Sequence, residues 1–155
     1  MELRTYQKEV VSLALANQSK TALYVLPTGA GKTIIFTAII QKLLENNKKI
    51  LVLAHRRILI EQINNYNALN GNLHIATKQG YVNKLGFDPD YIIIDEAHNV
   101  DFEKGQYKKI LETHENAKVI GFTATPIRMN NGLIYGKDKF FKSVDYFKKP
   151  EDLIN

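Results

Sequence analysis

The sequence lacks cysteine altogether, which excludes disulfide bonds and thiolate metal sites. It also lacks any apolar run near the roughly 20 residues that a helix needs to cross a bilayer. The N-terminal segment Met1–Arg4 has no apolar stretch of the kind found in signal peptides. We find no internal repeat and no low-complexity segment. These absences exclude membrane-spanning and disulfide-stapled classes, and they leave an ordinary globular domain.

Composition and length favour one domain with a true hydrophobic core, because 45% of the 155 residues are hydrophobic and 24% are charged. The net charge is +5, and it is unevenly distributed. Residues 1–80 contain ten Lys and Arg against four acidic residues, whereas residues 81–155 contain eleven against twelve. A basic N-terminal half suits a phosphate-rich partner such as nucleic acid, although many basic domains bind no such partner.

An apolar run, Ala22–Leu26, is followed by Pro-Thr-Gly-Ala-Gly-Lys-Thr at residues 27–33 and then by an apolar segment over residues 34–44. The first run has the length and β-rich composition of a buried strand, and the second is typical of a mostly buried helix. A strand, a glycine-bearing turn and a helix that opens on Gly-Lys-Thr form the setting of a phosphate-binding loop. Its glycines let backbone N–H groups converge on an anion beside the positive end of the helix dipole.

In such a loop Lys32 reaches the β- and γ-phosphates of a nucleotide, and the Thr33 hydroxyl binds Mg²⁺. The strict pattern begins with glycine, whereas Leu26 occupies that position here. A glycine-bearing turn can also be purely structural. The intact Gly-Lys-Thr core and its strand-to-helix setting favour phosphate binding.

The most apolar expected strand, residues 90–94, ends in Asp95-Glu96-Ala97-His98. A carboxylate at the tip of a buried strand, 63 residues after Lys32, can hold Mg²⁺ opposite the loop threonine. Glu96 is then placed to orient or deprotonate an attacking water. Two adjacent acids are common by chance, but behind a hydrophobic strand and downstream of a phosphate loop they indicate a nucleotide site.

Other polar groups follow expected strands, at the sheet edge where open α/β proteins bind ligands. Residues 50–54 predict a strand that leads to Arg56 and Arg57, which would hold nucleic-acid phosphates or simply begin a solvated helix. The short strand over residues 73–76, in which His74 is expected to pack in the core, leads to Thr77-Lys78-Gln79-Gly80. The strand over residues 118–122 ends in Thr123-Ala124-Thr125-Pro126, which leaves two hydroxyls beside the acids.

Two further helices are expected from apolar periodicity. The first follows Leu-Arg-Thr-Tyr-Gln at residues 3–7 and places Tyr6, Val10, Leu13 and Ala14 on one face. An arginine plane and a glutamine amide at its start could stack on adenine and bond its edge, although spacing alone favours an ordinary helix start. The second covers residues 102–114, with Phe102, Ile110, Leu111 and His114 on or near one face.

Four landmarks therefore stand in order: Pro-Thr-Gly-Ala-Gly-Lys-Thr, Val-Leu-Ala-His-Arg-Arg, Asp-Glu-Ala-His and Thr-Ala-Thr-Pro. Together they resemble the first RecA-like domain of superfamily 2 helicases and translocases of the DEAH-box type. The Leu-Arg-Thr-Tyr-Gln opening is similar to the adenine-reading segment of that family, in which the first loop glycine is often replaced. The resemblance covers the chain to about residue 128. It implies an α/β fold, a RecA-like P-loop domain with a mostly parallel central sheet and helices on both faces.

The resemblance also implies roles for individual residues. Adenine would be read by Arg4 and Gln7, and the phosphates would be wrapped by Thr28, Gly29, Ala30, Gly31 and Lys32. Mg²⁺ would lie between Thr33 and Asp95, with Glu96 as the catalytic acid/base and Lys32 and Asp95 assisting. Nucleotide state would be coupled to nucleic-acid binding by His98, Thr123 and Thr125, and the nucleic-acid backbone would lie along Arg56, Arg57, Thr77 and Gln79. The strand ending in Thr123 would lie between the loop strand and the Asp95 strand.

In this family ATP is hydrolysed between two RecA-like domains, and the second supplies arginine fingers. We expect residues 1–128 to form the first domain and residues 129–155 to be an extension or linker toward a second domain, in cis or in trans. The chain would then bind ATP and Mg²⁺ with little turnover alone and contact nucleic acid, DNA more readily than RNA. It would lie in the cytoplasm, or wherever the nucleic acid is, of a bacterial or virus-infected cell, with no membrane partner.

Two other functions fit parts of the pattern. One is a stand-alone module that binds nucleic acid under nucleotide control and has no motor activity, although a descendant without activity need not retain Lys32, Asp95 and Glu96. The other is a small-molecule kinase with a phosphate loop. The Asp-Glu-Ala-His and Thr-Ala-Thr-Pro motifs do not suit that kinase.

Overall fold

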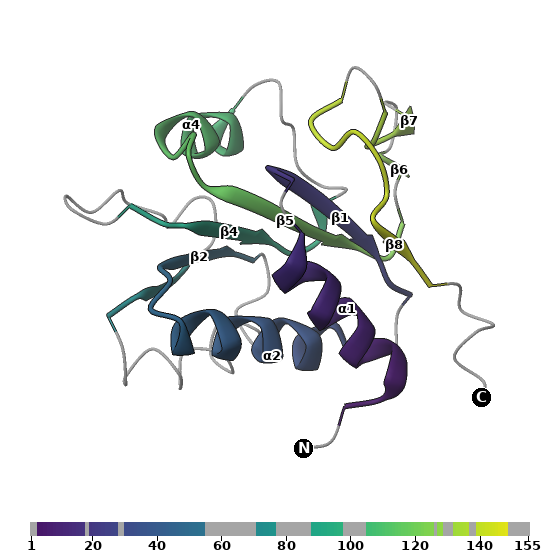
Figure 1. Cartoon of the computed structure of the whole chain (residues 1–155). Helices are drawn as coiled ribbons and strands as arrows, with labels where there is room; N and C mark the ends of the chain where they lie inside the picture. Colours follow the sequence, from purple (N-terminus) through teal and green to yellow (C-terminus); the bar gives the residue numbers. More distant parts are fainter. Residues whose placement is uncertain are drawn as a thin grey trace.

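The computed structural model describes residues 3–17, 19–27, 30–54, 71–76, 88–97, 105–125, 127–128, 132–136 and 139–148. Its centre is a six-stranded sheet in the order β3-β2-β4-β5-β1-β8, and every strand pair in it is parallel (Figure 1). The six strands are β1 (Thr21–Val25), β2 (Ile50–Leu53), β3 (Leu73–Ala76), β4 (Tyr91–Ile94), β5 (Lys118–Thr123) and β8 (Tyr146–Phe147). The expected RecA-like α/β class is therefore confirmed, with a wholly parallel sheet.

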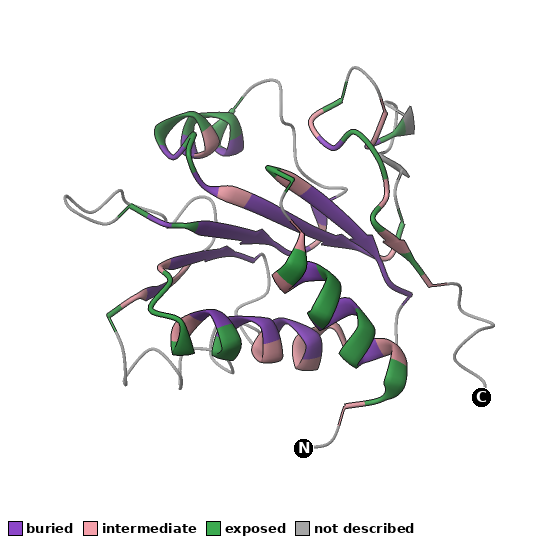
Figure 2. Ribbon diagram, viewed as in Figure 1, coloured by how far each residue is buried: buried purple, intermediate pink, exposed green. Residues whose placement is uncertain are grey.

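Helices cover both faces of this sheet. Helices α1 (Thr5–Ala16) and α2 (Lys32–Glu45) lie on one face, and α4 (Gln106–Thr113) lies on the other (Figure 1). Strands β2 and β4 are buried along their whole length, and Figure 2 shows the buried residues concentrated in the central strands. This burial on both faces explains why these strands are continuous apolar runs rather than alternating ones. None of the described helices is both long and apolar enough to span a membrane.

Helix α1 presents a different face to the core from the one that its apolar periodicity predicts. Gln7, Val10, Val11 and Ala14 are its buried residues, whereas Leu13 is 40% exposed. The prediction that Leu13 packs inward is therefore wrong. The helix is rotated toward Gln7 because that amide makes two hydrogen bonds, one of them to the loop that precedes α2.

An aromatic cluster fixes α2 against the strands. Phe36 of α2 meets Phe122 of β5 edge-on, with ring centroids 4.5 Å apart, and Tyr24 of β1 stacks on the same Phe122 at 5.4 Å. All three rings are fully buried. Because Phe36 lies one turn after Lys32, this cluster sets the position of the first turn of α2.

Two expectations about local structure are corrected. The helix expected over residues 102–114 begins at Gln106, because Gly105 has a φ of +89°, outside the helical region; Phe102 lies outside the described residues. His74 is half-buried rather than packed in the core, since among the described strands β3 stands at the edge of the sheet and pairs with β2 alone.

The C-terminal segment adds structure to the sheet. Strands β6 (Ile127–Arg128) and β7 (Gly132–Leu133) form a small antiparallel hairpin, and β8 pairs with β1 as the outermost strand. Phe141 is fully buried and packs against Gly121 in the middle of β5, where a Cβ on the glycine would come within 2.6 Å of the ring. Part of the segment expected to be an extension after residue 128 therefore packs on the same sheet.

Candidate active site

The carboxyl ends of β1, β5 and β4 meet at one edge of the sheet. Strand β5 lies between the other two, as the family resemblance implied. The Leu26 N–H donates to the Thr123 carbonyl at 2.9 Å, and the Asp95 N–H donates to the Leu53 carbonyl at 3.0 Å. These backbone bonds extend the strand ladder to the residues where the loop and the acids begin. The topology thus places both motifs at the edge where parallel α/β sheets bind ligands.

Lys32 lies between the two acids. Its Nζ is 3.3 Å from Glu96 Oε1 and 3.7 Å from Asp95 Oδ1. The three side chains are largely enclosed, with 19% of Lys32, 17% of Glu96 and 6% of Asp95 exposed. Partial exclusion of water strengthens such ion pairs relative to pairs at the open surface. The structure therefore brings the loop lysine and the two acids together.

Glu96 has an unusual backbone. Its φ is +55°, in the left-handed region that non-glycine residues seldom adopt, and its N–H donates to the Asp95 carboxylate at 2.9 Å. A residue in this conformation stores about 1–3 kcal/mol, and such strain gathers at functional sites. The turn directs Glu96 toward Lys32, while Asp95 stays buried at the strand tip.

The described part of the phosphate loop is fixed by two residues of α1. Gly31 has a φ of +77° and precedes α2 as its N-cap. The buried carbonyl of Ala30 accepts hydrogen bonds from Gln7 Nε2 at 3.0 Å and from the Tyr6 hydroxyl at 2.9 Å. A Cβ at Gly31 would lie 2.6 Å from Gln7 Nε2, so the glycine permits both the backbone conformation and the close approach of the amide.

Both the oxygen and the nitrogen of the Gln7 side-chain amide make hydrogen bonds. Besides its bond to Ala30, its Oε1 accepts from the Arg4 backbone N–H at 2.8 Å, in a capping box at the start of α1. In this structure Gln7 therefore links the helix start to the phosphate loop. Tyr6 was expected only as an apolar contact, and its bond to the loop was missed because periodicity reports a face but no hydrogen-bond partner.

A second residue that the sequence did not single out lies near the acids. Tyr107 of α4 is 2% exposed. Burial, and to a smaller extent the negative charge of Asp95, raise the pKa of Tyr107 to about 12. The hydroxyl therefore stays protonated at neutral pH. Its signal in the sequence is weak, because a single tyrosine on a short helix does not indicate which strand end it faces.

Thr123, the last residue of β5, and Thr125 close a small turn. The Thr123 hydroxyl donates to the Thr125 carbonyl at 2.7 Å, and the Thr125 N–H donates back to that hydroxyl at 3.1 Å. Thr123 is fully buried beside the first loop residues. The structure thus places the Thr-Ala-Thr turn at the same edge as the loop and the acids.

Several expected site residues lie outside the described residues. They are Thr28 and Gly29 of the loop, the coupling residue His98, and the nucleic-acid residues Arg56, Arg57, Thr77 and Gln79.

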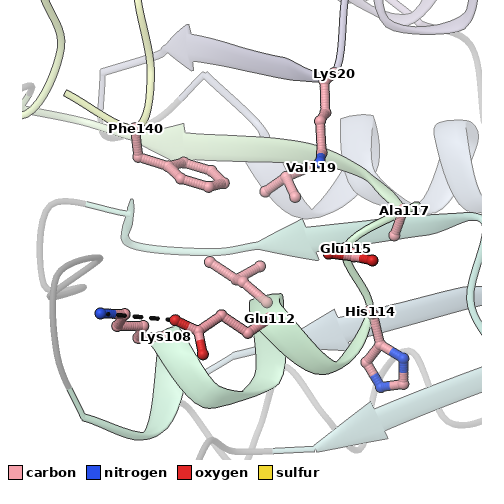
Figure 3. A pocket seen from close by; sticks show the side chains of 9 residues that line it. Lys20, Lys108, Glu112, His114, Glu115, Ala117, Val119 and Phe140 are labelled. Carbon is pink, nitrogen blue, oxygen red and sulfur yellow. Dashed lines mark ion pairs between the residues drawn. The ribbon is translucent and has the colours of Figure 1, made fainter. Parts of the chain in front are cut away.

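The domain has two pockets, one on the face covered by α1 and α2 and the other on the face covered by α4. One, of about 390 Å³, adjoins the start of α2 and is lined by Leu3, Thr33, Ile34, Thr37, Ala38, Gln41 and Lys42. The other, of about 270 Å³, lies at the starts of β1 and β5, away from the acids (Figure 3). Apolar groups such as Val119 and Phe140 form part of its wall, and the exposed Lys108–Glu112 ion pair at 3.6 Å lies on its rim. Only the first pocket includes a residue of the phosphate-loop motif, Thr33, in its lining.

Comparison with known proteins agrees with this geometry. The family described as "Type III restriction enzyme, res subunit" matches residues 1–85 and 63–128. A 51.5 kDa protein of a Lactococcus phage is 33% identical over 138 residues, which is 83% of this chain and 29% of that protein. The endonuclease subunit of the type I restriction enzyme EcoAI of Escherichia coli is 30% identical over 179 residues, 95% of this chain and 21% of that subunit. The chain thus spans less than a third of either relative.

Solved structures share the fold. The UvsW helicase of bacteriophage T4 superposes with a TM-score of 0.65 at 20% identity, covering 81% of this chain and 54% of that one. The SWI2/SNF2 ATPase core of Sulfolobus solfataricus, solved in complex with dsDNA, gives a TM-score of 0.58 at 19% identity, covering 82% and 33%. Sequence comparison leads to one assignment: the chain belongs to the family of the type III restriction enzyme res subunit.

Proposed function

We propose that this chain is the ATP-binding motor domain of an ATP-dependent helicase or translocase of the DEAH-box type, which couples ATP hydrolysis to movement on nucleic acid. The observation that carries the proposal is Lys32 held between Asp95 and Glu96 at the carboxyl edge of the sheet. This arrangement joins a cation for the phosphates to two acids for metal and water. A nucleotide switch without motor activity does not require the second acid, so its presence favours the motor.

Each side chain would have one task in the reaction. Lys32 leaves the acids to bind the β- and γ-phosphates, and the Gly31 N–H at the start of α2 binds the same oxygens. After Lys32 has moved, Glu96 would accept a proton from the water that attacks the γ-phosphorus in line. The γ-phosphate then leaves ADP.

The residues present fit Mg²⁺. Asp95 is a nearly buried carboxylate that already faces a cationic group, and Thr33 adjoins the lysine that makes this contact. Among the described residues no cluster of three or more His, Cys, Asp or Glu forms a complete metal cage. That suits Mg²⁺, which takes one or two carboxylates and completes its shell with phosphate oxygens and water. When bound, the ion would neutralise charge on the phosphates.

The pocket beside α2 suits the nucleoside. Its volume of about 390 Å³ is within the usual range for small ligands, and Leu3 on its wall is adjacent to Arg4. We propose that adenine is read here by Arg4 and Gln7, as the family resemblance implies. Gln7 has a second amide hydrogen and a second lone pair for that contact beyond the bonds that it makes here.

Nucleic acid and a second domain complete the proposal. We assign Arg56, Arg57, Thr77 and Gln79 to the nucleic-acid backbone, and His98, Thr123 and Thr125 to its coupling with the nucleotide. DNA is favoured over RNA because one relative is a restriction endonuclease subunit. A second RecA-like domain, in cis or in trans, would supply the arginine fingers, which are worth about 10³–10⁵ in rate in related phosphate-loop enzymes.

The test is a titration with a fluorescent ATP analogue in the presence of Mg²⁺. We expect the unmodified chain and Glu96→Gln to bind, and Lys32→Ala to lose at least about tenfold in affinity, because an amine that contacts phosphate directly is removed. Lys108→Ala is the matched control, since this lysine is exposed on α4, which lies on the opposite face of the sheet from α2. Equal affinity in Lys32→Ala and Lys108→Ala would remove the phosphate-loop assignment.

A second measurement addresses turnover. We expect residues 1–155 assayed by themselves to release little phosphate from ATP, with or without DNA, because in the proposed mechanism the arginine fingers come from a second RecA-like domain. Robust DNA-stimulated hydrolysis by the chain alone would show that the site is complete within one domain.

A further inference from the structure

Tyr6 contacts two segments that are distant in sequence. Its hydroxyl donates to the Ala30 carbonyl at 2.9 Å, and Lys148 Nζ lies 4.6 Å from the centre of its ring. The first contact is to the phosphate loop and the second is to the residue that follows β8. A single half-buried side chain on α1 therefore lies between the loop and the C-terminal segment.

The backbone of Lys148 is fixed next to the loop strand. Strand β8 pairs with β1 in the register that places Phe147 opposite Val25, and the Lys148 N–H donates to the Val25 carbonyl at 2.9 Å. Val25 is two residues before Pro27, where the phosphate loop begins. Asp145 adds a side-chain anchor, since its carboxylate accepts from the Leu23 N–H at 3.0 Å. The ammonium group thus reaches Tyr6 from a segment tied to β1.

The position of the Ala30 carbonyl depends on two side-chain hydrogen bonds. The carbonyl is shared by Tyr6 and Gln7, and Ala30 is 1% exposed, so water does not replace a lost donor freely. Gly31 follows it directly and begins α2. Because the peptide bond is planar, a shift of this carbonyl also rotates the Gly31 N–H, which binds phosphate in the proposed function.

We infer that Tyr6 is a positioning residue for the phosphate loop, and that Lys148 over its ring transmits the position of β8 to nucleotide affinity. This inference rests on the proposed nucleotide site. A docked β8 holds the ring, the ring holds the Ala30 carbonyl, and the loop keeps its phosphate-binding shape. Displacement of β8 and Lys148 from β1 withdraws the ammonium group and loosens the loop.

The test measures amide hydrogen exchange of the peptide over residues 24–36, together with affinity for the fluorescent ATP analogue. Lys148→Met keeps the length of the side chain and removes its charge, and Tyr6→Phe keeps the ring and removes the hydroxyl. We expect exchange to accelerate and affinity to fall about two- to fivefold in Lys148→Met, the loss of one cation–π contact, and about fivefold in Tyr6→Phe. Lys148→Arg should restore both values, and the exposed Lys139→Met should change neither.

A double-mutant cycle separates this relay from a merely structural role. In the Tyr6→Phe background Lys148→Met should have no further effect on the loop, because the ring no longer holds Ala30. The inference would be overturned if Lys148→Met still changed the loop in the Tyr6→Phe background. It would also be overturned if Lys148→Met in the otherwise unmodified chain had no more effect than Lys139→Met. If the unmodified chain bound no nucleotide, the proposed function would fail, and the exchange data would still decide the relay.

Discussion

Replacing Gly31 with alanine tests how closely the phosphate loop packs against α1. Two costs follow from the structure. An L-residue held in the left-handed region, at the Gly31 φ of +77°, loses about 1–2 kcal/mol. The new Cβ would lie 2.6 Å from Gln7 Nε2, so the amide must leave the Ala30 carbonyl at a cost of about 1 kcal/mol.

Alanine also leaves the unfolded chain with less conformational entropy than glycine does, and this effect offsets about 0.5 kcal/mol of these costs. The expected loss of folding free energy is therefore about 2 kcal/mol. Urea unfolding followed by circular dichroism measures it, and with a slope of about 2 kcal/mol per molar the midpoint should fall by about 1 M. Nucleotide affinity should fall with it, because the displaced amide no longer holds the loop.

Two control variants test whether strain and steric contact cause this loss of stability. Gly71→Ala should be nearly neutral, because no heavy atom lies within 4 Å of its Cβ and its φ is not positive. In a Gln7→Ala background the steric part should vanish, so Gly31→Ala should cost about 1 kcal/mol less than in the normal chain. A Gly31→Ala midpoint equal to that of Gly71→Ala would refute both the strain and the contact.

Three other predictions concern the rest of the domain. Gly121→Ala should lower the free energy of unfolding by about 1–3 kcal/mol through overpacking against Phe141, and adding Phe141→Leu should recover part of the loss in the same urea assay. Asp145→Ala should cost about 1–2 kcal/mol and speed hydrogen exchange in β1, because a backbone N–H of that strand loses its acceptor; unchanged exchange there would contradict the anchoring role. Burial lowers the pKa of His114 below its usual 6.5, so the unfolded chain binds the proton more readily and stability should fall as pH drops below about 6.5. Asp88 opposes this shift, so Asp88→Asn should steepen the decline in urea midpoints between about pH 7.5 and 5.5, and an unchanged slope would show that the pair is unimportant.

The strands, the loop and the acid pair could be predicted because each has a local cause. Strands buried on both faces must be apolar throughout, so β2 and β4 were visible as uninterrupted runs. A parallel sheet then brings the ends of β1 and β4 to one edge, so Lys32 and Glu96 could be expected to face each other.

The remaining features depend on tertiary contacts that no local pattern encodes. Gln7 is a polar residue that is buried because its amide is satisfied by the loop, and helical periodicity would place such a residue outside. Strand β8 has two residues, too few for an apolar signal, and it is held by its ladder with β1. The approach of Lys148 to Tyr6 joins opposite ends of the chain, and neither residue type indicates the other.

Because β8 and Phe141 pack on the sheet, they limit how far the protein can be shortened from its C-terminal end. Cutting the chain after residue 128, where the sequence resemblance fades, would uncover the hydrogen-bonding edge of β1 and remove the ring that covers Gly121. An exposed strand edge of this kind invites pairing between molecules. A fragment meant to stay monomeric should therefore continue at least through Lys148, well past the last recognisable motif.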